Sequence, residues 1–271
     1  MTRLLVRTSF AALLLLIAPW AQALVFAVNE GATYRVPNDE IRARYAIIAA
    51  DLSKLLKQPV TVEPVADYPS LRAGLAARSY DLAMVHPAHL SITAIKESGY
   101  KLVAITKGFQ QYRASFLVRG DSPLKTINDL KGQRLSMPED DSITARIVRA
   151  TLRDAQVDAK GLAINYTRYQ DVIPFAVENK LSNAGATAAN SVVAAWQAQG
   201  GRVLAQSRPV PIKHIIASPK LSAEQVDKVR EYLIGLDATE EGRKKLEPSK
   251  YAGFERYDDA AMLAIGAWLG L

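Results

Sequence analysis

The chain has 271 residues, a formal net charge of +7 and no cysteine. This length suits one large or two medium domains, and the absence of cysteine excludes disulfides and thiolate metal sites. The only histidines are His86, His89 and His214, and the basic residues are not clustered. We therefore expect neither a metal centre nor a nucleic-acid partner.

The first residues have the pattern of a secretory signal peptide. Arg3 and Arg7 precede an almost wholly apolar run over residues 10–18, and residues 21–23 read Ala-Gln-Ala, a small-residue cleavage pattern. We predict export with cleavage after Ala23, which leaves 271 − 23 = 248 residues. The apolar run is short for a membrane span, which argues against an uncleaved anchor, and a lipid anchor would need a cysteine after it.

Strands alternate with helices in the next part of the chain. The patterns predict strands over residues 24–29, 59–65, 80–85 and 102–106, and helices over residues 38–57, 68–78 and 86–98. Strands joined by helices pair in parallel through right-handed crossovers, so we expect a largely parallel sheet.

A second unit begins with a strand over residues 112–119, after the polar residues 107–111. The patterns that follow predict strands over 133–137, 162–166, 183–187, 202–205 and 212–217, and helices over 127–130, 142–155, 170–179, 190–199, 222–235, 240–246 and 258–269. We expect two α/β lobes joined near residues 107–113 and 206–212. Lobe 1 would comprise residues 24–109 with 208–271, and lobe 2 residues 110–207.

The strand, loop and helix over residues 133–155 form a candidate anion-binding corner. Asp141 or Ser142 is placed to cap the helix. The first-turn amides have no partner inside the helix, and the dipole is positive at this end, so an anion is favoured here. The hydroxyls of Ser142 and Thr144 could add donors. An ordinary capped helix with acidic residues at its start explains the same residues without a ligand.

Four stretches carry a resemblance to a known family. They are residues 80–85, Asp-Ser-Pro-Leu at 121–124 with Asp-Leu-Lys-Gly at 129–132, the corner at 141–144, and Glu-Asn-Lys at 178–180 before 183–186. In this order they resemble the periplasmic substrate-binding proteins of the phosphonate, phosphite and phosphate ABC-transporter family. The resemblance covers nearly the whole chain after residue 23.

This resemblance implies a two-lobed α/β fold of the type II periplasmic binding proteins. Each lobe would be a mixed, mostly parallel sheet flanked by helices, and the lobes would close over a ligand in the cleft between them. In the family, a Ser-Thr-Ser run at a helix start holds the oxyanion. That run corresponds here to Ser142, Ile143 and Thr144, so one hydroxyl is missing while the backbone amides remain.

The resemblance also implies four further ligand-binding positions. A family tyrosine falls at about Val85, so that donor is absent, and His86 beside it is the candidate replacement. A family histidine falls at about Tyr169 and a family aspartate at about Asn183. Tyr34, in the first loop, corresponds to an aromatic position that covers the ligand.

The expected ligand is a small anion, and the expected protein is a monomer without cofactor. Asn183 can donate or accept a hydrogen bond where the family has an acid, so the preferred protonation state of the ligand can differ. Glu139, Asp140 and Asp141 could instead favour a zwitterion or an amine-bearing ligand, whose acidic part the helix end would hold.

Two roles fit a soluble binding protein with a signal peptide. The first is the periplasmic solute-binding subunit of an ABC importer, whose partner is the permease. The alternative is a sensory binding protein that reports its ligand to a membrane histidine kinase. An enzyme is not expected, because Ser142 has no His-Asp partner in a motif context and no Gly-x-Ser-x-Gly motif occurs.

Overall fold

The computed structural model describes residues 22–31 and 36–271. The charged and apolar parts of the predicted signal peptide, and Tyr34, lie outside these residues. Within the described ranges, no helix combines the length and the apolar character that crossing a membrane requires.

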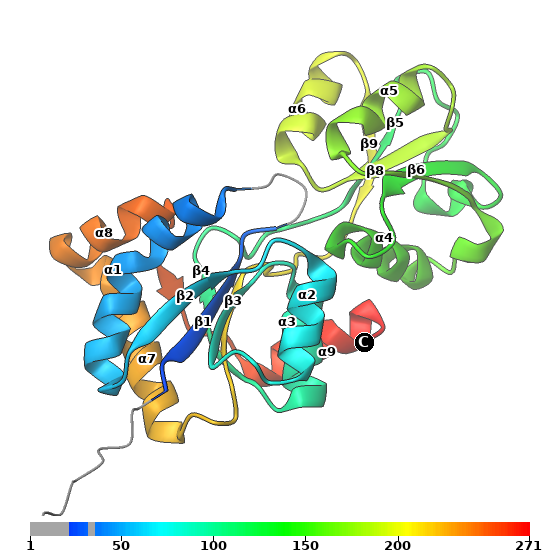
Figure 1. Cartoon of the computed structure of the whole chain (residues 1–271). Helices are drawn as coiled ribbons and strands as arrows, with labels where there is room; N and C mark the ends of the chain where they lie inside the picture. Colours follow the sequence, from blue (N-terminus) through cyan, green and yellow to red (C-terminus); the bar gives the residue numbers. More distant parts are fainter. Residues whose placement is uncertain (1–21, 32–35) are drawn as a thin grey trace, which may run out of the picture.

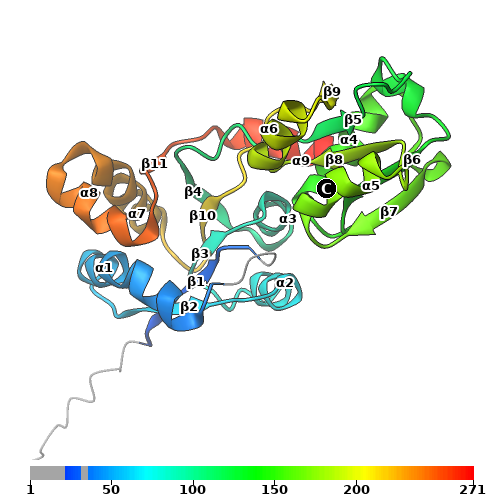
Figure 2. The same ribbon diagram turned by 90° about the horizontal axis from the view of Figure 1, so that it is seen from above.

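Two sheets covered by helices form two lobes (Figure 1). The sheet of lobe 1 has six strands in the order β11-β4-β10-β3-β1-β2. Its strands are β1 (Leu24–Asn29), β2 (Val60–Pro64), β3 (Leu82–Val85), β4 (Lys101–Thr106), β10 (His214–Ala217) and β11 (Phe254–Glu255). Its helices are α1 (Asn38–Leu56), α2 (Tyr68–Ala76), α3 (Ala88–Ser98), α7 (Ala223–Gly235) and α8 (Glu240–Leu246), with the 3₁₀ turns η4 (Leu236–Ala238) and η5 (Glu247–Ser249). Figure 2 shows α1, α7 and α8 on one face of this sheet and α2 and α3 on the other.

The sheet of lobe 2 has five strands in the order β7-β6-β8-β5-β9. The strands are β5 (Ser115–Val118), β6 (Arg134–Pro138), β7 (Ala163–Thr167), β8 (Ala184–Thr187) and β9 (Arg202–Gln206). The helices are α4 (Ile143–Asp154), α5 (Ile173–Glu178) and α6 (Asn190–Ala198), with the 3₁₀ turns η1 (Ile127–Leu130), η2 (Ala159–Gly161) and η3 (Gln170–Val172).

Both sheets are mixed, and the strand that follows each lobe crossing runs against its neighbours. The strands β1, β2 and β3 pair in parallel, as do β6, β7 and β8. In contrast, β10 is antiparallel to β3 and β4, and β5 is antiparallel to β8 and β9. The chain leaves lobe 1 at the end of β4 and returns at the start of β10, which lies beside that end. Because β10 starts where β4 stops, the two strands run in opposite directions. The predicted parallel order therefore holds for the helix-linked strands, and the two-residue strand β11 was not predicted.

The two crossing segments lie against each other between the lobes. Tyr112 and Val210 form an antiparallel bridge, in which the Val210 amide donates to the Tyr112 carbonyl oxygen over 2.9 Å. The Ile212 amide donates to the Phe109 carbonyl oxygen over 3.1 Å. Both chain crossings between the lobes therefore pass through one paired ribbon.

The last helix, α9 (Asp259–Leu269), links the lobes a third time, because it packs against α3 of lobe 1 and α4 of lobe 2. The indole Nε1 of Trp268 donates to the Asp154 carboxylate over 2.8 Å. Arg208 donates to the same carboxylate over 2.8 Å, and its guanidinium lies 4.9 Å from the Trp268 ring centre. This contact lies beside the paired crossing segments.

Candidate ligand site between the lobes

A cavity of about 190 Å³ lies between the lobes. Lobe 1 contributes the first turn of α2, and lobe 2 contributes the loop from β6 to α4 and the loop after β7. The lining residues are Asp67, Tyr68, Pro69, Pro138, Glu139, Asp141, Ser142, Arg168 and Gln170. The predicted corner therefore faces a concave space that both lobes enclose.

Ser142 is the N-cap of α4, which settles the choice between Asp141 and Ser142. Its hydroxyl oxygen accepts a hydrogen bond from the Ala145 amide over 3.1 Å. The Ser142 hydroxyl hydrogen stays available to a ligand, because the cap uses only the oxygen. The amides of Ile143 and Thr144 also lack acceptors within the helix. One hydroxyl and two amides at the positive end of α4 can thus bind one anionic group.

The side chains of Ile143 and Thr144 point away from this role. Ile143 is buried in the hydrophobic core, so only its backbone amide can reach a ligand. The Thr144 hydroxyl is buried and lies 2.7 Å from the Tyr112 hydroxyl. Thr144 therefore joins the corner to the first crossing segment, and its predicted role as a ligand donor stays a prediction.

The first turn of α2 closes the cavity from lobe 1. The Asp67 carboxylate caps α2 by accepting from the Ser70 amide over 2.7 Å. Asp67, Glu139 and Asp141 are acidic and Arg168 is basic, so the lining combines both signs. An anion at Ser142 would have carboxylates nearby, and a ligand that also carries an ammonium group would meet them.

His86 lies at the end of β3 and is not among the side chains that line the cavity. Its ring Nδ1 is 3.3 Å from the carbonyl oxygen of Ile212 in the second crossing segment. Burial, reinforced by the charge of Lys213, lowers the pKa of His86 to about 4. The ring is neutral at neutral pH and contacts the second crossing segment rather than the corner.

Asn183 is not brought together with the corner. It precedes β8, where its amide donates to the Arg134 carbonyl oxygen over 2.9 Å and its side-chain oxygen accepts from the Arg134 amide over 3.1 Å. Arg134 begins β6, whereas Ser142 follows the end of β6, and β6 and β8 are parallel. Asn183 therefore lies at the opposite edge of the sheet. The residue of β8 at the cleft edge is Thr187.

Gln170, which was not predicted, lines the cavity beside the corner, and Thr187 at the end of β8 holds it in place. The Thr187 hydroxyl donates to the Gln170 side-chain oxygen over 3.0 Å, and the Ala188 amide donates to the same oxygen over 2.6 Å. These bonds fix the orientation of the Gln170 amide at the cavity wall. Tyr169, a predicted site residue, is exposed beside them, with the Arg168 guanidinium 5.6 Å from its ring centre.

A buried ion pair lies on the lobe 1 side, where β1 ends. The Lys213 ammonium lies 2.9 Å from the Glu30 carboxylate, which also accepts from the hydroxyls of Tyr45 and Tyr251 over 2.6 Å each. Lys213 also lies 4.6 Å from the ring centre of Phe109 in the first crossing segment. Burial alone would raise the pKa of Glu30, but Lys213 and the two tyrosines hold it below its ordinary value. The network joins the first loop to both crossing segments.

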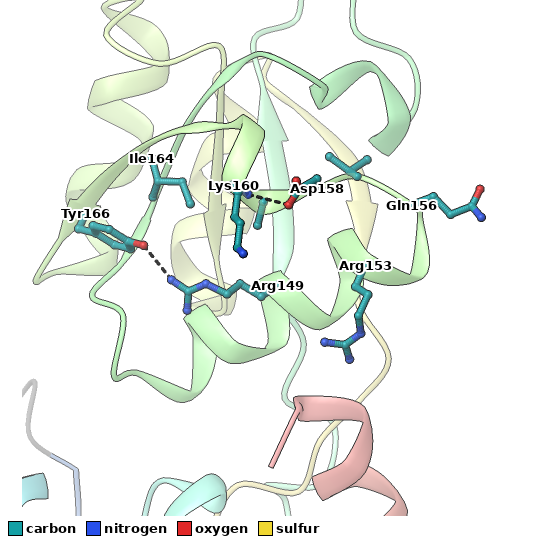
Figure 3. A pocket seen from close by; sticks show the side chains of 9 residues that line it. Arg149, Arg153, Gln156, Asp158, Lys160, Ile164 and Tyr166 are labelled. Atoms are coloured by element: carbon teal, nitrogen blue, oxygen red, sulfur yellow. Dashed lines mark hydrogen bonds between the residues drawn. The ribbon is translucent and has the colours of Figure 1, made fainter.

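A larger cavity, of about 660 Å³, lies away from the cleft on lobe 2 (Figure 3). Arg149, Arg153 and Lys160 border it, and Ile164 and Tyr166 lie along its wall. Arg149 already donates to the Tyr166 hydroxyl over 2.7 Å and to Asp140, and Arg153 donates to a backbone carbonyl of α9. Both arginines of this cavity therefore already have hydrogen-bond partners within the protein.

Within residues 22–31 and 36–271, no group of three or more His, Asp or Glu side chains is arranged to hold a metal ion. His86 and His89 do not form the pair that their spacing would allow on one helix, because His86 precedes the start of α3.

Comparison with solved structures shows which known fold the chain has. The PhnD1 protein of Prochlorococcus marinus, in complex with methylphosphonate, is 16% identical with a TM-score of 0.65, covering 92% of this chain and 97% of that one. A Xanthomonas citri protein bound to ATP is 14% identical with a TM-score of 0.74, with the same coverages of 92% and 97%. A binding-protein component of a phosphonate ABC transporter from Pseudomonas aeruginosa is 18% identical with a TM-score of 0.60, covering 91% and 85%. These likenesses confirm the type II two-lobed fold.

No curated protein sequence matches closely enough to count as a relative. A family model described as "ABC transporter, phosphonate, periplasmic substrate-binding protein" matches residues 31–262, which include every helix of both lobes except the end of α9. The chain therefore belongs to the family of periplasmic substrate-binding proteins of phosphonate ABC transporters.

Proposed function

We propose that this chain captures a small oxyanion-bearing ligand in the cleft and delivers it to the permease of an ABC importer. The observation that carries the proposal is the Ser142 corner, where Ser142 lines a cavity that the other lobe closes and caps a helix whose first-turn amides lack acceptors within the helix. In this proposal the signal peptide ends at Ala23, the mature protein is a periplasmic monomer, and the lobes divide at residues 109/110 and 207/208.

The size of the cavity favours a small ligand. About 190 Å³ is below the range of roughly 300–1,000 Å³ that holds drug-sized molecules. Methylphosphonate, the ligand in the Prochlorococcus structure, is of a suitable size, whereas ATP, the ligand in the Xanthomonas structure, would need a wider cleft. We therefore propose a phosphonate, phosphite or phosphate with few additional atoms.

A thermal-shift screen with phosphate, phosphite, alkylphosphonates, sulfonates and amino acids identifies the ligand. Titration calorimetry with Asp141→Asn then determines its charge. Removing a carboxylate beside a bound anion should tighten binding or leave it unchanged, whereas an ammonium-bearing ligand would bind the variant more weakly. A screen in which none of the oxyanions binds would overturn the proposal.

Reconstitution in membranes tests which membrane protein receives the loaded binding protein. The loaded protein should stimulate the ATPase activity of its importer in proteoliposomes, and the unloaded protein should do so less. The contrary result is that the loaded protein changes the autophosphorylation of a membrane histidine kinase without stimulating the ATPase activity of any importer. That result would replace transport by the sensory role. Small-angle scattering should show a smaller radius of gyration with saturating ligand, because the crossing segments act as the hinge.

A further inference from the structure

Beyond the corner, the seam between α2, α3 and α4 contains buried nitrogen atoms without partners. His89, in the first turn of α3, is 1% exposed, and neither ring nitrogen has a hydrogen bond within the described part of the chain. The Nε of Arg146 on α4 is also buried and has no partner there. Buried donors of this kind normally bond to something, because leaving them unpaired is costly.

Both lobes contribute an arginine, and thus a positive charge, to the seam. Arg146 follows Ser142 by one helical turn on α4 of lobe 2. Arg72, on α2 of lobe 1, is exposed and lines a neighbouring cavity. Burial and Arg72 lower the pKa of Arg146, and Asp141 offsets part of this effect. Neither arginine forms an ion pair among the residues that the structure describes.

His89 responds to both arginines. Burial, with the charges of Arg146 and Arg72, lowers its pKa to about 3. The ring is therefore neutral at neutral pH, and one of its nitrogens carries a hydrogen that it can donate. The acidic groups near this seam are Asp141 and Glu97, which lines a neighbouring cavity together with Arg72.

We propose that this seam binds a small oxyanion of the sulfate or phosphate class, held by His89 and Arg146 with Arg72 opposite. An acceptor of two or more negative charges would satisfy the unpaired donors and offset the two like charges of Arg72 and Arg146, the first of which acts on the pKa of the second. Because Arg72 belongs to lobe 1 and Arg146 to lobe 2, the bound anion favours the closed arrangement of the lobes. The same anionic chemistry could come from free solution or from a second acidic group of the cleft ligand.

Nuclear magnetic resonance of the imidazole groups tests the site directly. The chain has three histidines, so the ring signals of a ¹⁵N-labelled sample can be assigned by substitution. Sulfate is titrated into ligand-free protein at constant ionic strength, with gluconate as the balancing anion. The His89 ring signal should shift and saturate, while that of His214, whose Nε2 lies 3.1 Å from the Pro211 carbonyl oxygen, should stay unchanged.

Four variants test whether the side chains of the seam hold the anion. Arg146→Gln and Arg72→Gln should each weaken the sulfate response roughly tenfold or more, because each removes a charged hydrogen-bond donor. Arg42→Gln, which removes one exposed positive charge from α1, should respond as the wild type does. Ser142→Ala should also keep the response, because the corner is not part of the seam.

Each contrary outcome is specific. A wild-type His89 signal that does not shift, or a shift that both arginine variants retain, overturns the anion site and leaves water as the partner of these donors. A shift that Ser142→Ala also abolishes would assign the anion to the corner and overturn a separate site. A response that appears only with the cleft ligand, and not with sulfate, would identify a second acidic group of that ligand as the occupant. If no oxyanion binds the corner while His89 still responds to sulfate, the proposed function fails and this inference stands.

Discussion

The double role of Ser142 can be tested by separating its cap from its ligand contact. Its hydroxyl oxygen caps α4 through the Ala145 amide at 3.1 Å, and its side chain lines the cleft cavity with the hydroxyl hydrogen left available to a ligand. Ser142→Ala removes both interactions. Loss of the cap should lower the free energy of unfolding by about 1 kcal/mol, within a usual range of roughly 0.5–2 kcal/mol. Loss of a hydrogen bond to an anion is worth about 1.5–3 kcal/mol, or roughly a ten- to hundredfold weaker affinity.

Ser142→Asp separates the two effects. Aspartate is a good N-cap, and its charge is favourable at a helix start, so stability should equal or exceed that of the wild type. The same carboxylate would face the bound anion, so affinity should fall further than in Ser142→Ala. Urea unfolding measures the first effect, and titration calorimetry with the ligand from the screen measures the second.

Ser222 provides the matched control. It caps α7 in lobe 1 by accepting from the Gln225 amide over 3.2 Å, away from the cleft. Ser222→Ala should therefore cost a similar amount of stability and leave affinity unchanged. The reasoning is refuted if Ser142→Asp binds the oxyanion as tightly as the wild type does, or if Ser222→Ala weakens binding as much as Ser142→Ala.

Three further predictions concern the buried ion pair and the chain start. Lys213→Met should lower the free energy of unfolding by about 3–5 kcal/mol in urea, because Glu30 is left charged and buried, and the added change Glu30→Gln should recover part of this loss. Since the folded pKa of Glu30 lies below its ordinary 4.5, its stabilising effect is present above that pH and is lost as the pH falls through the lower value. Between about pH 5 and about pH 3, the melting temperature of Glu30→Gln should thus fall less than that of the wild type. An equal fall in both proteins would contradict this reasoning. Intact mass of the exported protein should show Leu24 as the first residue, and a product that retains residues 10–18 would disprove the cleavage site.

Local patterns in the sequence predicted most of the elements and the capped corner. Strand and helix periodicity, Ser142 before an amphipathic helix, and proline and glycine at element ends are interactions between near neighbours in the chain. Such signals could not show which part of lobe 1 faces Ser142. The approach of Asp67 depends on the angle between the lobes, which no local pattern encodes.

The surroundings of two predicted site residues differ from what the motif suggested, and the geometry of the fold explains both cases. Asn183 was matched by motif alone, but it precedes β8, and the first residue of a parallel strand lies at the edge opposite the cleft. Strand direction would have favoured Thr187, where β8 ends. The Thr144 hydroxyl was expected in the cleft, yet it pairs with Tyr112, which is 32 residues earlier and belongs to the first crossing segment. Long-range pairs of this kind carry no signature in a single sequence.

The strand order also determines which lobe can fold first. Lobe 1 begins the chain, but its central strand β10 lies between β3 and β4 and is supplied only at residues 214–217. A chain that emerges from its amino end thus presents four strands of lobe 1 with a gap through the middle of the sheet. All five strands of lobe 2 lie between residues 115 and 206, so its sheet can close before β10 arrives. Lobe 2 is then an early folding unit, and lobe 1 stays open to proteases and chaperones until the second crossing segment returns.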